Sequence, residues 1–141
     1  MKEMALQQAV QEFVRSFGLL DQSTTPCGRP LPASQAHALQ VLGEEGALPQ
    51  QSLADRLGLE KSTVSRMVSD MVGRGWVDRA PNPANRREVR LSLTEAGSSM
   101  LDQILVAADS RCQAIWRRIP AEKQAQVLET LQLLARATRK E

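Results

Sequence analysis

The chain is poor in aromatic residues, with 3% Phe, Trp and Tyr together and no Tyr at all, and it has only one His. So few rings argue against a pocket lined for phenolic ligands, although an aliphatic pocket stays possible. With a single His, no closely spaced Cys pair, no Gly-rich phosphate loop and no nucleophile elbow, the sequence lacks the common catalytic motifs. We therefore expect a protein that is not an enzyme.

The sequence also lacks a long apolar run, because no stretch approaches the roughly 18 residues needed to span a bilayer. Its first residues form an amphipathic, partly acidic segment rather than a secretory signal. The two cysteines, Cys27 and Cys112, lie too far apart in sequence to suggest a disulfide framework. These features predict a cytoplasmic protein with no membrane partner, folded as a single domain over residues 1–141.

The small positive net charge of +2 is unevenly distributed along the chain. Residues 50–90 hold eight Lys and Arg against five Asp and Glu, whereas the remaining segments hold ten against eleven. All of the positive excess therefore falls on one segment, as expected for a surface that faces phosphates. Charge alone is equally compatible with an ordinary solvated face.

That segment begins with the pattern of two short helices separated by a tight turn. The first helix is predicted over residues 52–57, and Gly58 ends it by supplying the positive φ of a sharp turn. A second helix opens at Lys61. Its predicted inward positions are Val64, Met67, Val68, Met71 and Val72, and its outward positions are Ser62, Thr63, Ser65, Arg66, Ser69 and Asp70. Hydroxyls and an Arg on the outward face suit phosphates and base edges.

A basic β-hairpin is predicted directly after the second helix. Residues 76–79 begin an extended segment, residues 81–85 form a turn cluster, and residues 88–93 alternate polar and apolar side chains as a returning strand. Arg86 and Arg87 form the basic tip. The predicted fold is therefore mainly α-helical with a small β-hairpin, a winged helix-turn-helix whose DNA-binding part spans residues 33–94.

Longer helices flank this module. They are predicted over residues 3–20, 33–44, 95–118 and from Pro120 onward, with a loop over 21–32 and with Ser34 and Thr94 as N-caps. The module can cover only part of their apolar area. Residues 1–20 and 95–141 are therefore predicted to be dimerisation helices that pair with a second copy, the alternative being a monomer whose outer helices pack together.

The order of these pieces resembles the MarR family, the multiple-antibiotic-resistance regulators of bacteria, over essentially the whole chain. The matching elements are Leu31-Pro32-x-x-Gln35, Ser52-Leu53-Ala54 with Leu57-Gly58, Ser62-Thr63-Val64-Ser65-Arg66, Gly75-Trp76-Val77-x-Arg79, and Asn85-Arg86-Arg87-x-Val89-x-Leu91-x-Leu93-Thr94-x-x-Gly97.

The resemblance implies a roughly triangular homodimer, with a recognition helix in each major groove and each wing reaching the flanking minor groove. Arg87 matches the wing-tip arginine of the family, which enters narrow A·T-rich minor grooves. The family usually has Asp where this chain has Asn85, so the wing arginine is expected to be held by a weaker, neutral hydrogen bond. A more mobile wing, or an arginine freer for DNA, would follow.

Arg66 is the residue of the recognition helix able to make a bidentate contact to guanine, and its alternative role is an i,i+4 salt bridge to Asp70. Gln50, Gln51 and Ser52 are predicted to contact backbone phosphates at the start of the preceding helix. The full set of predicted DNA-contact residues is Gln50, Gln51, Ser52, Lys61, Ser62, Thr63, Ser65, Arg66, Arg74, Asn85, Arg86 and Arg87.

Three residues could serve a sensing role. His37 stands where the resemblance places a metal-ligand histidine of zinc-responsive relatives, and Cys27 and Cys112 are thiols that could join it on zinc or a softer metal. Thiol oxidation at Cys27, to a sulfenate or an intersubunit disulfide, is the rival use. In the simplest interpretation none of them senses anything: Cys112 is a small buried apolar group and His37 a hydrogen-bonded helix residue.

Together these patterns predict a sequence-specific transcriptional regulator, favoured to be a repressor, that binds a pseudo-palindromic operator as a homodimer. An effector, whether a small molecule, a thiol oxidant or a metal, is expected to release it from DNA. The alternative is a winged-helix module that binds other proteins and has no specific DNA target. No cofactor is required, although a metal such as zinc is compatible with the three sensing candidates.

Overall fold

The computed structural model describes residues 1–139 and separates into two compact units, one made of residues 1–107 and one that begins at Ala108. Each unit is described by itself. Within residues 1–139, no helix has both the length and the apolarity needed to cross a bilayer. The predicted organisation as one domain stays a prediction.

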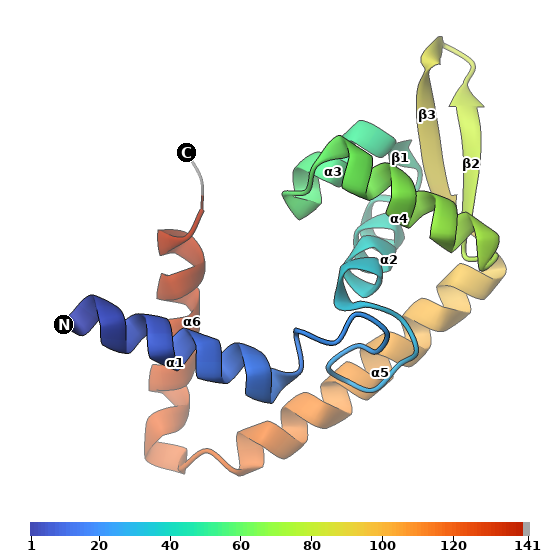
Figure 1. Ribbon diagram of the computed structural model, residues 1–141. Helices are drawn as coiled ribbons and strands as arrows, with labels where there is room; N and C mark the ends of the chain where they lie inside the picture. Colours follow the sequence, from blue (N-terminus) through green and yellow to red (C-terminus); the bar gives the residue numbers. More distant parts are fainter. Residues whose placement is uncertain (140–141) are drawn as a thin grey trace. The chain divides into compact units, whose positions relative to one another are not determined.

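Most elements belong to the first unit (Figure 1). They are α1 (Lys2–Phe17), α2 (Ala33–Glu45), β1 (Leu48–Pro49), α3 (Gln50–Leu57), α4 (Lys61–Gly73), β2 (Val77–Asn82), β3 (Asn85–Leu93) and the first half of α5 (Glu95–Arg117). This order confirms the predicted winged helix-turn-helix, mainly helical with a small sheet.

The core of this unit lies where α2, α3 and α4 pack against the sheet. Leu39 of α2, Leu53 of α3 and Val68 of α4 are each fully buried, and Leu91 closes the core from β3. The inward positions predicted for α4 are confirmed at Val64, Met67, Val68 and Met71. Val72 was wrongly placed inward, since it lies at the edge of the apolar stripe and is 37% exposed.

The sheet has the strand order β1–β3–β2, and both pairs are antiparallel. The strands β2 and β3 continue farther than predicted, because only Pro83 and Ala84 separate them. Asn82 tightens this turn by accepting a 3.0 Å hydrogen bond from the Ala84 N–H. The predicted turn cluster at 81–85 is therefore too long. The two residues of β1 were not predicted, since so short a strand leaves no alternating pattern.

The helix boundaries follow local capping chemistry. The Thr94 side chain accepts a 3.0 Å hydrogen bond from the Gly97 N–H, which confirms the predicted cap of α5. The cap predicted at Ser34 is wrong, because α2 begins directly after Pro32 and has no side-chain cap. Helix α1 ends at Phe17 rather than at residue 20, since Gly18 takes a left-handed conformation with φ of 95°.

Much apolar surface stays exposed in both units. No residue of α1 is buried, and Phe13 is 48% exposed. The second unit consists of the end of α5, a short 3-10 turn η1 (Ala121–Lys123) and α6 (Gln124–Ala137), which also has no buried residue. Leu128, Leu131 and Leu133 of α6 are each about half exposed. Trp116, near the end of α5, is 36% exposed. Pairing with a second copy would cover such faces.

Candidate nucleic-acid interface

One face of α4 carries the polar side chains predicted to meet DNA. Its first two turns bury Val64, Met67 and Val68 against the core, which fixes the rotation of the helix. As a result the remaining side chains of these turns, Lys61, Ser62, Thr63, Ser65 and Arg66, are all exposed. Their exposure agrees with the predicted outward face, while their contact with DNA stays a prediction.

The start of α3 presents a second polar group. Helix α3 begins at Gln50, two residues earlier than predicted, so Gln50, Gln51 and Ser52 all lie in its first turn. The N–H groups of a first turn have no partner within the helix and carry the positive end of its dipole. Backbone amides and polar side chains here can therefore receive an anion such as a phosphate.

The wing supplies two exposed arginines, Arg86 and Arg87. The Asn85 side-chain oxygen accepts a 3.2 Å hydrogen bond from the backbone N–H of Arg87. Asn85 thus holds the main chain of Arg87 and not its guanidinium, which agrees with the freer arginine that the resemblance suggested. Arg90 differs, because its Nε lies 3.3 Å from the Glu88 carboxylate.

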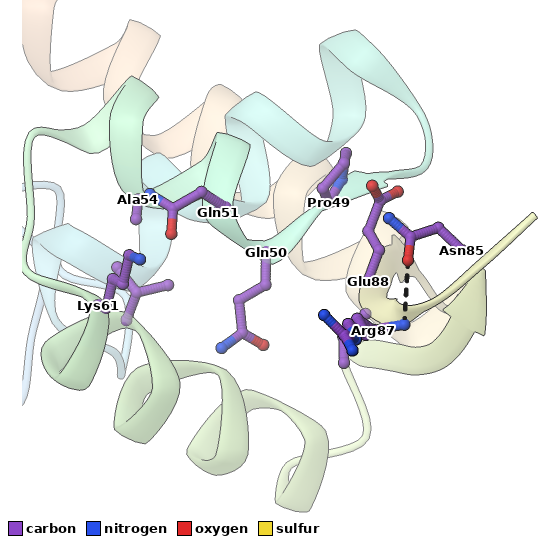
Figure 2. A pocket seen from close by; sticks show the side chains of 10 residues that line it. Pro49, Gln50, Gln51, Ala54, Lys61, Asn85, Arg87 and Glu88 are labelled. Atoms are coloured by element: carbon purple, nitrogen blue, oxygen red, sulfur yellow. Dashed lines mark hydrogen bonds between the residues drawn. The ribbon is translucent and has the colours of Figure 1, made fainter.

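These three regions surround a common pocket of about 400 Å³ (Figure 2). Gln50 comes from α3, Lys61 from α4 and Arg87 from β3, and Figure 2 shows their side chains around the same hollow. Glu88 is the acidic residue in its lining. Two cations and an amide on three elements favour a negatively charged ligand. The Glu88 carboxylate repels the part of such a ligand that comes close to it.

The ion pairs divide the cations of this segment into two classes. Arg56 pairs with Glu44 and Glu45, Arg74 pairs with Asp70, and Arg90 pairs with Glu88. Within residues 1–139 no ion pair involves Lys61, Arg66, Arg79, Arg86 or Arg87, and all five are exposed. Of these, Arg79 donates to the Ser69 hydroxyl at 2.9 Å. The unpaired positive charge of the segment is therefore concentrated on the recognition helix and the wing.

The salt bridge between Arg66 and Asp70, weighed as the alternative role of Arg66, is not formed. Asp70 instead accepts a hydrogen bond from Gln35 at 2.7 Å and forms a salt bridge with Arg74 at 3.2 Å. Arg74 also donates to the Pro30 carbonyl at 3.0 Å. This role of Gln35 was not predicted, since in the sequence Gln35 stands out only by its place in the Leu-Pro-x-x-Gln motif.

The segment that carries this surface matches known proteins. The sequence model of the MarR family matches residues 31–89. Over this segment the chain is similar to the MarR family. The matched residues run from the start of α2 into β3, and they include all twelve predicted DNA-contact positions.

Relatives of known sequence that are similar to this chain are named as transcriptional regulators. The HTH-type transcriptional regulator MT0903.1 of Mycobacterium tuberculosis is 34% identical over 87 residues, which are 62% of this chain and 57% of that protein. The HTH-type transcriptional repressor NicR of Pseudomonas putida is 29% identical over 82 residues, 58% of this chain and 52% of that protein. The chain thus spans little more than half the length of these relatives.

Solved MarR-family structures match over nearly the whole chain. The PcaV regulator of Streptomyces coelicolor, in complex with its natural ligand, is 26% identical with a TM-score of 0.67, covering 97% of this chain and 91% of PcaV. A mutant MarR of E. coli complexed with operator DNA has a TM-score of 0.77 at 21% identity, covering 94% and 95%. At 21% identity, the similarity to the E. coli structure shows a shared fold.

The three sensing candidates do not gather into a ligand set. No group of three or more His, Cys, Asp or Glu side chains within residues 1–139 is arranged to hold a metal ion. Cys27 is half-buried against the core and lies 3.0 Å from the Thr25 hydroxyl, whereas His37 and Cys112 are exposed. The expected burial of Cys112 is therefore wrong for the single chain.

Proposed function

We propose that this chain is a sequence-specific DNA-binding transcriptional regulator of the MarR family. The observation that carries the proposal is the group of exposed cations on α4 and at the tip of the wing, Lys61, Arg66, Arg86 and Arg87, which have no ion-pair partner among residues 1–139. Such cations need not break an ion pair to bind a phosphate, so each can release condensed counterions from DNA at full effect.

Each part of this surface has a role in the proposal. Helix α4 enters the major groove, where Arg66 reads a guanine and the hydroxyls of Ser62, Thr63 and Ser65 reach phosphates and base edges. The first turn of α3 binds a backbone phosphate. Arg87, held through its main chain by Asn85, enters the minor groove.

The regulator is proposed to act as a homodimer. Helices α1 and α6 have no buried residue in the single chain, although Met4, Leu6, Val10 and Phe13 of α1 and three leucines of α6 are large apolar side chains. Leaving so many apolar side chains in water is costly, at roughly 25 cal/mol per Å². A two-fold dimer covers them and presents two recognition helices to a pseudo-palindromic site.

Repression with release by an effector completes the proposal. NicR is named a repressor, and PcaV was solved with its natural ligand. Both names support a repressor that leaves its operator when a small molecule binds. A thiol oxidant acting at Cys27, or a metal bound between two copies, are the other effector classes, and thiol titration with and without zinc before DNA binding separates them.

The test compares two single substitutions on one strand. DNA binding is measured by fluorescence anisotropy against the duplex that flanks the chain's own gene and against random duplex, over a range of salt. Arg87→Ala is expected to weaken specific binding at least tenfold, since it removes an unpaired groove contact. Arg90→Ala is the matched control and is expected to change binding less than threefold, because Arg90 pairs with Glu88.

The proposal is wrong if the wild-type protein shows no salt-dependent preference for the flanking duplex. The proposed minor-groove contact of Arg87 is wrong if the Arg87→Ala variant binds DNA as tightly as the Arg90→Ala variant. Absence of all DNA binding from a folded dimer would favour the protein-binding module, although the polar face of α4 offers such a partner little apolar contact.

A further inference from the structure

A hydrogen-bond network at the far end of α4 is not part of the DNA-contact surface. A single carboxylate oxygen of Asp70, Oδ2, accepts a hydrogen bond from Gln35 Nε2 at 2.7 Å and forms a salt bridge with Arg74 Nε at 3.2 Å. The Arg74 guanidinium also donates to the Pro30 carbonyl at 3.0 Å and lies 4.9 Å from the centre of the Trp76 ring. The network thus joins α4 to the loop before α2, to α2 itself and to the start of the wing.

The members of this network differ in burial, and Gln35 is the most buried of them. Gln35 is only 5% exposed, and its Oε1 has no hydrogen-bond partner among residues 1–139. The only described partner of its amide is therefore Asp70, and a buried amide that lost it would be wholly unsatisfied. Asp70 and Arg74 are more exposed, with 51% and 38% of their side-chain surface accessible.

Arg74 is fully engaged by these partners. One guanidinium that pairs with a carboxylate, donates to a carbonyl and stacks on an indole cannot turn toward a phosphate without giving up all three contacts. Its geometry differs from that of Lys61, Arg66, Arg86 and Arg87, which form no ion pair among residues 1–139. Arg74 was among the predicted DNA contacts, but its partners suit a residue that fixes the helix in place.

We propose that Gln35, Asp70 and Arg74 are positioning residues that set the orientation of the recognition helix and thereby the affinity for DNA, without touching DNA. The inference rests on the proposed function. The buried stripe of α4 fixes its rotation, while this network ties its C-terminal end to α2 and the preceding loop. Contacts to base edges tolerate displacements of only about 0.5 Å, so a loosened end lowers affinity.

Asp70→Asn gives the sharpest test, because two physical accounts predict opposite signs. The substitution removes a negative charge beside the DNA-facing surface, so charge alone predicts tighter binding. The positioning role predicts binding about threefold weaker or more, since the charged acceptor that holds Gln35 and Arg74 is lost. Asp70 is half exposed, so the variant is expected to fold.

Gln35→Glu tests the same contact from the other side, and α5 offers a matched control. Gln35→Glu sets a carboxylate against that of Asp70 and is expected to weaken DNA binding about tenfold, or 1.4 kcal/mol. Gln113 donates to Asp109 at 2.9 Å, so Gln113→Glu makes the same change at an exposed amide–carboxylate pair. It adds equal charge and is expected to leave affinity within twofold. Light scattering checks that both variants keep the wild-type assembly.

Rescue separates positioning from a loss of fold. In the double variant Gln35→Glu with Asp70→Asn, the carboxylate of residue 35 accepts from the amide of residue 70, whose oxygen accepts from Arg74. Affinity is expected to return to within threefold of wild type. Arg74→Lys keeps the charge but cannot serve three partners, so it is expected to lose affinity with an unchanged salt slope.

The duplex used is one selected by the wild-type protein from a random library, so a failure to select any duplex refutes the proposed function and not the network. With a selected duplex in hand, tighter binding by Asp70→Asn overturns the inference. Equal losses for Gln35→Glu and Gln113→Glu do the same. If Gln35→Glu does not fold, the decision falls to Asp70→Asn and Arg74→Lys, of which the second must lose affinity.

Discussion

The close contact between Gly97 and Trp76 predicts a large difference between two glycine-to-alanine substitutions. A Cβ added at Gly97 would lie 2.0 Å from the Trp76 carbonyl oxygen and 2.9 Å from its carbon. Normal C···O contacts begin near about 3.3 Å. The same carbonyl accepts a 3.0 Å hydrogen bond from the Thr94 N–H, so it is held in place.

The atom that this added Cβ would meet belongs to the backbone, so no side chain can rotate away. Forcing an extra methyl group into a packed site costs about 1–3 kcal/mol, and a fixed backbone partner places this case near 3 kcal/mol. Replacing Gly by Ala in a helix returns up to about 1 kcal/mol. The net loss of stability expected for Gly97→Ala is therefore about 2 kcal/mol.

Gly73→Ala is the matched control. A Cβ at Gly73, the last residue of α4, meets no atom within 4 Å among the described residues. The substitution is expected to stabilise the protein by up to about 1 kcal/mol through the unfolded state. At about 2–4 °C per kcal/mol for a chain of this size, the two variants should melt about 6–12 °C apart by circular dichroism. A difference in stability of 1 kcal/mol shifts the melting temperature by about 2–4 °C. If the two melting temperatures differ by less than about 2 °C, the close approach of α5 to Trp76 is wrong.

Three further predictions concern other parts of the structure. Met71→Ala empties a fully buried position and is expected to cost about 2–5 kcal/mol in urea unfolding, whereas Val72→Ala, at 37% exposure, should stay within about 0.5 kcal/mol; equal costs would contradict the rotation of α4. Thr94→Ala removes the cap of α5 and is expected to cost about 1 kcal/mol, with Thr94→Ser retaining most of the stability. Hydrogen bonds from the Ser23 backbone N–H, then from the hydroxyls and N–H of Ser23 and Thr24, lower the pKa of Asp21 to about 2. The stabilisation is therefore complete above pH 3.8 and lost as the pH falls toward 2, and NMR titration of Ser23→Ala should show that pKa moving partway back toward 3.8.

The apolar periodicity predicted the winged helix-turn-helix well because each of its helices packs on one side only. The stripe of α4 was right at Val64, Met67, Val68 and Met71, and the Thr94 cap was right because capping is a local interaction. The predicted turn at 81–85 was too long because Pro and Asn were taken as loop residues throughout. In the structure Pro81 and Asn82 belong to the edge strand β2, where a proline costs no ladder bond.

The candidate site divides in the same way. Exposure of the polar residues of α4 and of Arg87 followed from the sequence, since it depends on local periodicity and on the turn. The status of the arginines did not follow, because Arg66 and Arg74 differ in partners that lie elsewhere in the sequence. Pro30 lies 44 residues before Arg74, and Gln35 lies 35 residues before Asp70.

The sequence by itself determined the order of the elements, the resemblance to the MarR family and the polar face of the recognition helix. These depend on spacing, on capping and on glycine conformation, which act within a few residues. Only the tertiary structure decided which cations remain free. Ion pairing is set by distances between segments, and folding placed Asp70 beside Gln35 and Arg74 while leaving Lys61, Arg66, Arg86 and Arg87 without an acidic partner among the described residues.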